Sequence, residues 1–279
     1  MKKYIYTFVL SFLLLGCQEV IDIDLEDGDA RLIVDAYFEI NNGDTSFLTS
    51  QTNGVKLSTA APYFDTNIPT VSNALVSIKN LTDNSIINFE ESNEPGFFIP
   101  VDGIIFQPDY NTTYELTVVY NNETYTSTAE RIPTVPIDLI EQRDGMLFTG
   151  DEIELFVEFT DDGSRDDFYI FDLDFNLFVP TDDELYQGET FNFSYYYDDQ
   201  MADEQDVTVK VMGVDEDYFN YFNLIIDQSE QDGSPFQTTP VLIKGNIVNT
   251  TNQDNYAFGY FRISDAYSLE TTLIKKTED

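Results

Sequence analysis

The chain has 279 residues, of which 52 are acidic and 13 are basic, so its formal net charge at pH 7 is −39. Such a surface repels phosphate backbones, which excludes nucleic acid as a natural partner. The chain has no histidine and a single cysteine, which excludes imidazole catalysis and an internal disulfide. Two interpretations of the charge stay open: solubility in a salty medium that screens self-repulsion, or capture of divalent cations or a basic partner.

Met1 is followed by two lysines, an apolar stretch over residues 4–15, a glycine and Cys17. This order is typical of a secretory signal peptide, predicted over residues 1–16, and the stretch is short for a membrane span. Residues 14–17 (LLGC) resemble a bacterial lipobox, so we expect lipidation of the Cys17 thiol. Two or three acyl chains hold a protein on a membrane effectively permanently. The alternative is an ordinary signal peptide followed by a buried cysteine.

Residues 17–30 are predicted to form a lipidated cysteine followed by an acidic tether, with six carboxylates between positions 18 and 30. Acidic residues behind a lipidated cysteine resemble the signal that exports Bacteroidota lipoproteins to the outer face of the outer membrane. We therefore expect a lipid-anchored protein that faces the cell exterior. Removal of the signal peptide leaves 11 basic and 52 acidic residues, a net charge of −41, so the acyl anchor must hold the protein without help from anionic lipid.

From Arg31 onward, short runs of alternating polarity predict a first β-sandwich domain over residues 31–132. An Asn121-Asn122 pair suits a tight hairpin turn, and the prolines of residues 132–136 are expected to form a stiff domain boundary. The predicted strands of this domain cover residues 32–40, 71–79, 113–120 and 124–129. Residues 73–78, 96–98 and 113–118 together resemble the prealbumin-like sandwiches of bacterial surfaces.

A second β-sandwich is predicted over residues 137–279, which makes the fold class all-β with two Ig-like or prealbumin-like domains. The pattern changes once, where Asp215 and two further acids precede apolar residues spaced three and four apart. This predicts a helix near residues 216–228, capped by Asp215 and packed on the sandwich by its aromatic face. The predicted strands cover residues 151–160, 168–179, 190–197, 207–211, 241–248, 256–263 and 269–274.

The search for catalytic chemistry favours a protein that is not an enzyme. No glycine-rich phosphate loop follows any predicted strand, and the only cysteine is expected to carry lipid. A hydrolase built on two carboxylates is an alternative, but 52 acidic residues make chance pairs unavoidable. The sequence also has no tryptophan on which a sugar could stack.

Calcium is the metal that carboxylate-rich turns would bind, because it takes six to eight oxygen ligands. The first candidate set lies in one turn and consists of Asp161, Asp162, Asp166 and Asp167. A second set lies within residues 198–206, and a third would alternate along one strand at Asp172, Asp174 and Asn176. The alternative for each set is a solvated turn or strand face without metal.

Aromatic side chains gather at residues 195–197 and around residues 218–222. Alternation and helical spacing place most of them in a core. Tyr196 lies on the strand face opposite Tyr195 and Tyr197, so it is the ring that we expect to contact a partner.

Several segments together resemble a Bacteroidota lipoprotein family catalogued as domain of unknown function 4249. They are the lipobox, residues 32–36 and 73–78, the predicted helix, and a C-terminal set at positions 235–236, 240, 245–247 and 259–261. Family members are often encoded beside TonB-dependent transporters, so the resemblance implies a surface accessory subunit and transfers no catalytic residue. We expect the partner to be an outer-membrane transporter or other outer-membrane complex; the alternative is a free-standing adhesin or ligand-binding module, calcium dependent or not.

Overall fold

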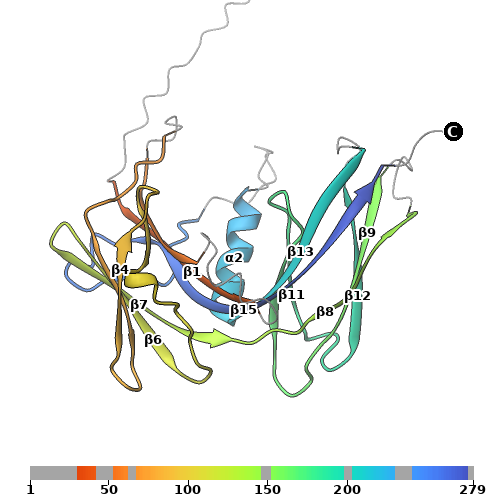
Figure 1. Ribbon diagram of the computed structural model, residues 1–279, viewed down its shortest axis with the longest axis horizontal. Helices are drawn as coiled ribbons and strands as arrows, with labels where there is room; N and C mark the ends of the chain where they lie inside the picture. Colours follow the sequence, from red (N-terminus) through yellow and green to blue (C-terminus); the bar gives the residue numbers. More distant parts are fainter. Residues whose placement is uncertain are drawn as a thin grey trace, which may run out of the picture.

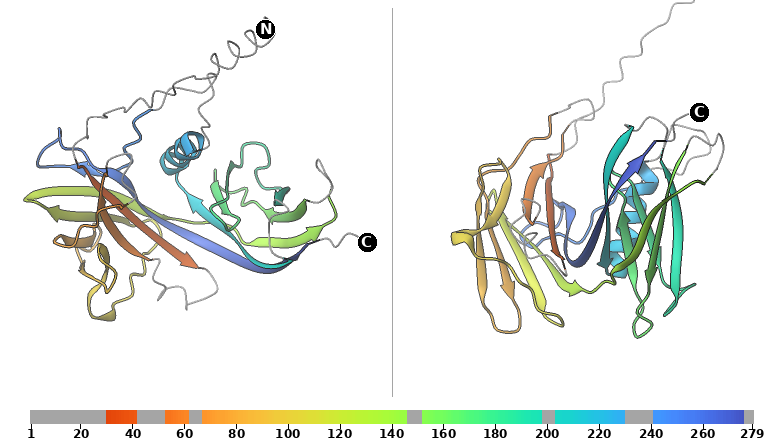
Figure 2. Two further views of the ribbon diagram at one scale, coloured as in Figure 1. Left: turned by 90° about the horizontal axis from the view of Figure 1, so that it is seen from above. Right: turned by 45° about the vertical axis from the view of Figure 1, so that its right-hand side comes forward.

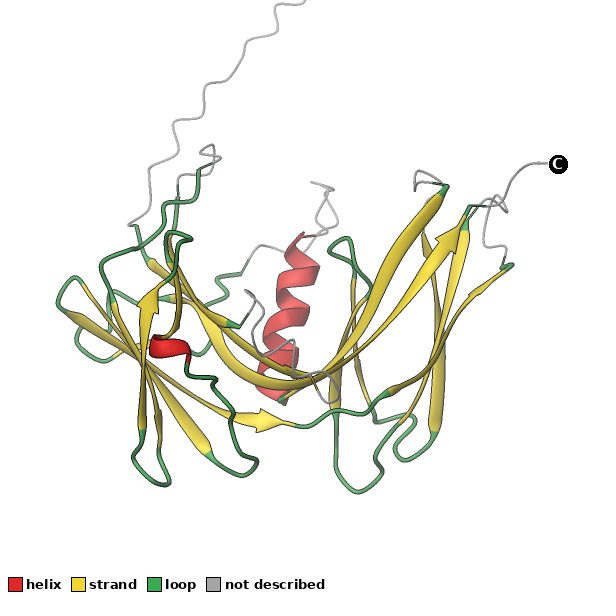
Figure 3. Ribbon diagram, viewed as in Figure 1, coloured by secondary structure: helices red, strands yellow, loops and turns green. Residues whose placement is uncertain are grey.

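The computed structural model describes residues 30–41, 53–61, 67–145, 152–197, 203–229 and 241–275. Nearly all of the described secondary structure is β (Figures 1 and 3). The N-terminal half contains β1 (Leu32–Asn41), β2 (Gly54–Thr59), β3 (Leu75–Asn80), β4 (Ile86–Glu91), β5 (Phe97–Pro100), the 3-10 helix η2 (Val101–Gly103), β6 (Thr113–Tyr120) and β7 (Glu123–Ile132). The C-terminal half contains β8 (Ile137–Arg143), β9 (Ile153–Thr160), β10 (Phe168–Asp172), β11 (Phe178–Asp182), β12 (Thr190–Tyr197), β13 (Glu204–Val214), α2 (Glu216–Ser229), β14 (Val248–Asn249) and β15 (Phe258–Ile274).

Twelve of these strands form one mixed sheet, in the order β11-β10-β13-β15-β1-β2-β5-β4-β3-β6-β7-β14. Strand β7 also pairs with β15, so the strands from β15 and β1 through to β7 close into a ring of hydrogen-bonded neighbours. This ring, which we call the N-terminal lobe, encloses a core of apolar side chains that includes Val34, Leu57, Leu116 and Phe261. In β1 and β6, buried residues alternate with partly exposed ones, as the alternating polarity of the sequence predicted. One face of each strand therefore points into this core.

The remaining strands β8 to β13, together with the second half of β15, form the C-terminal lobe, which has two layers. A three-stranded sheet in the order β12-β9-β8 lies against the part of the large sheet made by β10, β13 and β15. Apolar residues of both layers share one core, among them Phe159 of β9, Phe171 of β10 and Val209 of β13. Close packing of such faces is the main source of stability for a β structure of this kind.

Strand β15 joins the two lobes. Residues Phe258 to Ala266 pair in parallel with β1, and residues from Ala266 to Ile274 pair antiparallel with β13. Figure 1 shows this blue strand running from one lobe to the other across the lower end of α2. One continuous sheet therefore crosses the predicted boundary at residues 132–136, and its topology does not separate into two independent sandwiches.

The predicted helix is confirmed as α2, which lies between the lobes when the molecule is seen from above (Figure 2). The backbone N–H of Tyr218 donates to the carboxylate of Asp215 over 2.7 Å, so the predicted N-cap is present. The aromatic face packs on the sheet: ring centroids are 4.9 Å apart for Tyr218 and Tyr260, and 5.3 Å apart for Phe222 and Phe178. Among the described helices, none has the length and apolar character needed to cross a membrane.

Several strand predictions are confirmed, and three are wrong. The predictions for β6 and β12 match their bounds, and Asn121 and Asn122 adopt the positive φ angles that the hairpin requires. Residues 168–179 are two strands with a turn at residues 173–177, not one strand. Residues 241–247 are not a strand, because only Val248 and Asn249 pair, with β7. The two strands predicted over residues 256–274 are one strand, β15.

Candidate functional site

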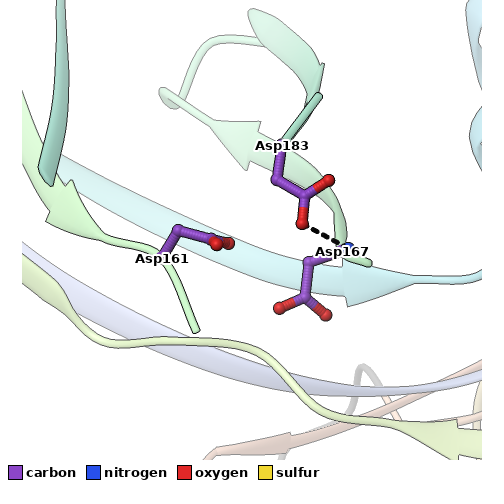
Figure 4. A group of neighbouring side chains, drawn as sticks. All are labelled: Asp161, Asp167 and Asp183. Atoms are coloured by element: carbon purple, nitrogen blue, oxygen red, sulfur yellow. Dashed lines mark hydrogen bonds between the residues drawn. The ribbon is translucent and has the colours of Figure 1, made fainter. Parts of the chain in front are cut away.

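Three buried aspartates converge in the C-terminal lobe. Asp161 follows the end of β9, Asp167 precedes β10 and Asp183 follows β11 (Figure 4). Each contributes a carboxylate oxygen to a group whose members lie within 4.8 Å of one another. Their exposed fractions are 6%, 4% and 6%, which is unusual for aspartates and indicates a specific environment.

Strand pairing creates this cluster. Phe168 at the start of β10 pairs with Asp182 at the end of β11, so the next residue outward on each strand, Asp167 and Asp183, must also be neighbours. The N–H of Asp167 accordingly donates to Oδ2 of Asp183 over 2.8 Å. Asp161 comes from the other layer, and its Oδ2 accepts the N–H of Gly188 over 2.7 Å, which fixes it to the turn after β11.

The hydroxyl of Tyr169 lies between two of the carboxylates, 2.5 Å from Oδ1 of Asp161 and 2.8 Å from Oδ2 of Asp167. A tyrosine hydroxyl carries one hydrogen, so it can donate to only one carboxylate at a time. The second short contact becomes a hydrogen bond when the other carboxyl group carries a proton. A proton or a metal ion would therefore stabilise the cluster.

The pKa shifts of two of the three aspartates favour protonation of the cluster. Burial raises the pKa of Asp167, although hydrogen bonds from Arg165 and Tyr169 act in the opposite direction. Burial also raises the pKa of Asp183, and the nearby charges of Asp161 and Asp166 add to this effect. Among the described residues, the guanidinium that contacts the cluster is that of Arg165, whose Nε lies 2.6 Å from Oδ1 of Asp167. No ion pair of a described residue reaches Asp161 or Asp183.

Carboxylate oxygens are the ligands that calcium prefers. Oδ2 of Asp161 accepts the N–H of Gly188, and Oδ1 of Asp167 accepts Nε of Arg165, while Oδ1 of Asp161 and Oδ2 of Asp167 both lie within hydrogen-bond distance of the Tyr169 hydroxyl. Oδ2 of Asp183 accepts the N–H of Asp167. A calcium ion bound by all three carboxylates would have to displace the hydroxyl of Tyr169.

The structure brings together two of the four aspartates predicted as ligands. Asp161 and Asp167 belong to the cluster, whereas the side chain of Asp162 is 42% exposed and pairs with Arg165 over 2.5 Å. Asp166 is exposed and accepts a hydrogen bond from Gln187 over 3.0 Å. The third member, Asp183, was missed because residues 168–179 were interpreted as one strand. The hairpin that returns the chain to Asp167 was therefore absent from the prediction.

The other predicted acidic sets lie elsewhere. Within residues 198–206, positions 198–202 are outside the described residues, and Asp206 of β13 accepts a hydrogen bond from Thr272. Asp172 ends β10, but Asp174 and Asn176 lie in the turn before β11 with positive φ angles. The prediction that these three alternate along one strand is wrong, because the chain reverses between them.

Tyr196 is half-buried on β12 and faces away from the core of the C-terminal lobe, which contains Tyr195 and Tyr197. A Cβ atom on Gly145 would lie 3.0 Å from the Tyr196 ring, so the glycine leaves room for that ring. Its role in partner binding stays a prediction. Cys17, the signal peptide and residues 17–29 of the tether lie outside the described residues.

Fold and site together define a β-rich, strongly acidic protein with a buried carboxylate cluster and no histidine anywhere in the chain. The model of a family described as "Domain of unknown function (DUF4249)" matches residues 18–270, so the chain belongs to this family. That match confirms the resemblance seen in the sequence. Comparison with curated proteins gives no match.

Proposed function

We propose that this protein is a non-enzymatic lipoprotein of the outer cell surface, and that it serves as an accessory subunit of a TonB-dependent transporter or another outer-membrane complex. An acyl anchor on Cys17 would attach the protein to the membrane. The length of residues 18–30 would then limit how far the folded lobes extend from the membrane. Thirteen residues span at most about 45 Å when fully extended. The folded lobes would then contact the transporter or its cargo close to the membrane.

The observation that carries this proposal is an exposed apolar patch at the end of α2, formed by Leu224, Val241 and Leu242. Their exposed fractions are 43%, 54% and 59%. Leu224 lies one turn before Gln228, whose Nε2 donates to the carbonyl of Val241 over 2.9 Å, so helix and following segment are contiguous. Exposed apolar patches on soluble domains mark contact surfaces, and this one stands out on so acidic a chain.

The position of this helix-end patch fits a partner in the membrane. Figure 1 shows the start of β1 and the last turn of α2 on the same upper side of the molecule. A tether that ends at residue 30 would enter the fold at β1, so the patch would lie on the side of the anchor. A transporter embedded in the same membrane would meet this side.

Purification from native outer membranes in mild detergent tests the proposal. We expect stoichiometric co-elution with an outer-membrane transporter, and loss of that partner when Leu224 and Leu242 are both changed to serine. Leu75→Ser is the matched control, because Leu75 is 74% exposed on β3 of the N-terminal lobe. Elution of the wild-type protein without any outer-membrane partner would contradict the proposal. Mass spectrometry of the N-terminal peptide tests the anchor separately, since an unmodified Cys17 thiol rules it out.

A second candidate function is a free-standing, calcium-dependent adhesin or ligand-binding module. The cluster of Asp161, Asp167 and Asp183 favours it, because a metal ion would stabilise three buried carboxylates. A ligand that binds only the folded state stabilises it by about 2.7 kcal/mol at a hundred times its Kd. Thermal melting with calcium chloride is the test, with magnesium as the comparison. No shift at millimolar calcium ends this candidate.

We also propose that residues 31–132 and 137–279 are two sandwich-derived modules whose sheets have merged through β15. The two facing layers of the C-terminal lobe support this division. A protease site inserted between residues 132 and 137 tests it: after cleavage, both fragments should stay associated, because β15 still pairs with β1 and with β13. Fragments that separate and remain folded would show that β15 does not join the modules.

A further inference from the structure

We propose that the free edge of β12 binds an extended segment of a partner protein in which basic and apolar residues alternate, and that this segment adds to the sheet as a further strand. Strand β12 ends the three-stranded sheet β12-β9-β8, so no described strand pairs with its other edge. This goes beyond the accessory role proposed above, because it assigns a recognition mode to a different surface. The helix that carries the helix-end patch packs on β10 and β11, in the other layer of the lobe.

Four strands end the two described sheets, and β12 differs from the other three. Natural edge strands are usually protected from further pairing by short length, proline, charged residues or a bulge. Strand β11 has five residues and contains Pro180, and β14 has two residues. Strand β8 carries Asp138, Glu141 and Arg143 and has a register shift after Ile137. Strand β12 has eight residues, TFNFSYYY, with no charge, no proline and no glycine. Its edge is therefore open to strand addition.

The pairing of β12 with β9 decides which backbone groups face the free edge. The N–H of Asp161 donates to the carbonyl of Glu189 over 3.1 Å, one position before the start of β12 in the same register. Bonded and non-bonded pairs alternate along an antiparallel ladder, so every second residue of β12 directs its N–H and C=O away from β9. These residues are Thr190, Asn192, Ser194 and Tyr196. They include the ring that the sequence predicted to contact a partner.

The inward face of β12 is incompletely covered. Phe191 and Phe193 point toward the core of the C-terminal lobe but are only partly buried. Their register partners on β9, Phe159 and Val157, are 0% exposed. An added strand with apolar residues on this side would cover the exposed parts of the two rings, and burial of apolar area favours binding. This predicts apolar side chains at every second position of the partner segment.

The outward face predicts the other half of the partner's pattern. Glu158 and Glu154 of β9 lie opposite Asn192 and Tyr196 on this face. The one basic residue that β8, β9 and β12 place there is Arg143, which already pairs with a glutamate over 3.0 Å. A lysine on an added strand would lie two strand spacings, about 10 Å, from β9, so its long side chain can reach toward Glu158. A second copy of the chain would instead bring its own net charge of −39 to this edge, which disfavours self-pairing.

Binding of an eight-residue peptide of alternating lysine and valine, with acetyl and amide ends, tests the proposal. Isothermal titration of the full mature chain at an ionic strength of about 0.15 M should show saturable binding of one peptide per chain. Two further peptides carry N-methyl groups on all lysines or on all valines. They have the same charge, but only one of them loses the N–H groups that face β12. That peptide should bind at least about tenfold more weakly, because several hydrogen bonds are lost, and the other should stay within about twofold.

A variant of the protein tests the same edge from the other side. Asn192→Pro removes an N–H that points to the free edge and leaves the bonds between β12 and β9 in place, a position where proline is tolerated. It should weaken peptide binding by about tenfold, whereas the control Asn192→Thr keeps the N–H and should stay within about twofold of wild type. The methylated peptides use the wild-type protein, so they decide the question even where Asn192→Pro fails to fold.

Three results would overturn the proposal. The first is the absence of saturable binding up to about 1 mM peptide, and the second is equal weakening by both sets of N-methyl groups. The third is equal binding of a peptide with glutamate in place of every lysine, which would contradict the role of charge. Sedimentation of the wild-type chain distinguishes the remaining occupant: a dimer that Asn192→Pro dissociates would assign this edge to a second copy instead of a basic partner.

Discussion

Nη2 of Arg262 on β15 donates to Oε1 of Glu39 on β1 over 2.7 Å, at the point where the two lobes meet. The other carboxylate oxygen accepts Nζ of Lys210 on β13 over 2.8 Å, so Glu39 links three neighbouring strands. The guanidinium of Arg262 also lies 5.1 Å from the ring centroid of Tyr218 on α2. This buried ion pair therefore connects the helix with the strands that join the lobes.

Changing Arg262 to methionine should destabilise the fold by about 3 kcal/mol, because it leaves a buried carboxylate with one cation instead of two. Urea unfolding measures the loss. Arg143→Met is the control, since the Arg143 and Glu141 side chains are 41% and 53% exposed and such pairs contribute less than about 1 kcal/mol. Equal losses in the two variants would show that the Arg262 contact does not secure the junction.

The stability that Glu39 contributes should depend on pH. Burial acts to raise the pKa of Glu39, but Arg262 and Lys210 outweigh it and lower the pKa from 4.5 to about 2. A lowered pKa stabilises the fold above pH 4.5, and this stability is lost as the pH falls toward 2. Glu39→Gln should therefore cost about 3 kcal/mol at pH 7 and progressively less below pH 4.5, measured by urea unfolding across that range.

Asp35, which lies on the same strand, provides a control because its pKa is shifted in the opposite direction to that of Glu39. Burial raises the pKa of Asp35 above 3.8, while Tyr37 and Lys56 counteract this only in part. A raised pKa means that the stability contributed by the protonated carboxyl is present at low pH and lost as the pH rises. Asp35→Asn should thus gain stability relative to wild type at pH 7 and lose that advantage near pH 3. The same direction of change in both variants would contradict these assignments.

Sequence patterns predicted well the strands and the helix that depend on neighbouring residues. They predicted poorly the features that depend on partners far away in the sequence. Alternation found β1, β6 and β12, and the Asp215 cap found α2, because these signals lie within a few residues of one another. The continuity of β15 was missed because the predicted strands stopped at residue 263 and began again at residue 269, on either side of the polar residues at positions 264 and 265. Asp265 is 1% exposed, and its Oδ1 accepts Nε of Arg131 over 2.6 Å, from 134 positions away. No local pattern can reveal such a partner.

The candidate site shows the same limit. Asp161 and Asp167 were singled out because they share one turn, and the structure confirms that their carboxylates lie together. Asp183 joined them only through the pairing of β10 with β11. Clusters assembled by strand pairing can be predicted only after the hairpin itself is found.

Tyr169→Phe should reveal the charge state of the aspartate cluster. The change removes the hydroxyl between Asp161 and Asp167, and we expect a loss of about 2 kcal/mol at pH 7, where two carboxylates would face each other. The loss should shrink near pH 4 as protonation relieves that repulsion, because the pKa of Asp167 is raised by burial.

Tyr197→Phe is the matched control for that experiment. Tyr197 is also a buried tyrosine, but its hydroxyl donates to a neutral group, the carbonyl of Leu173, over 2.7 Å. We expect a loss of about 1 kcal/mol that is the same at pH 4 and pH 7. A loss for Tyr169→Phe that is equally independent of pH would argue against a shared proton in the cluster.

The connection between the lobes should be sensitive to a single methyl group at Gly213 of β13. A Cβ atom there would lie 1.9 Å from the carbonyl oxygen of Pro133, and that segment is fixed because Val135 and Ile137, which follow it, are both buried. Gly213→Ala should therefore cost about 3 kcal/mol in urea unfolding through overpacking. Gly103→Ala has nothing within 4 Å and should cost only about 1 kcal/mol, from its φ of +66°. If the two variants lose the same stability, the segment is free to move away from β13, and the lobes are held together by β15 and its ion pairs alone.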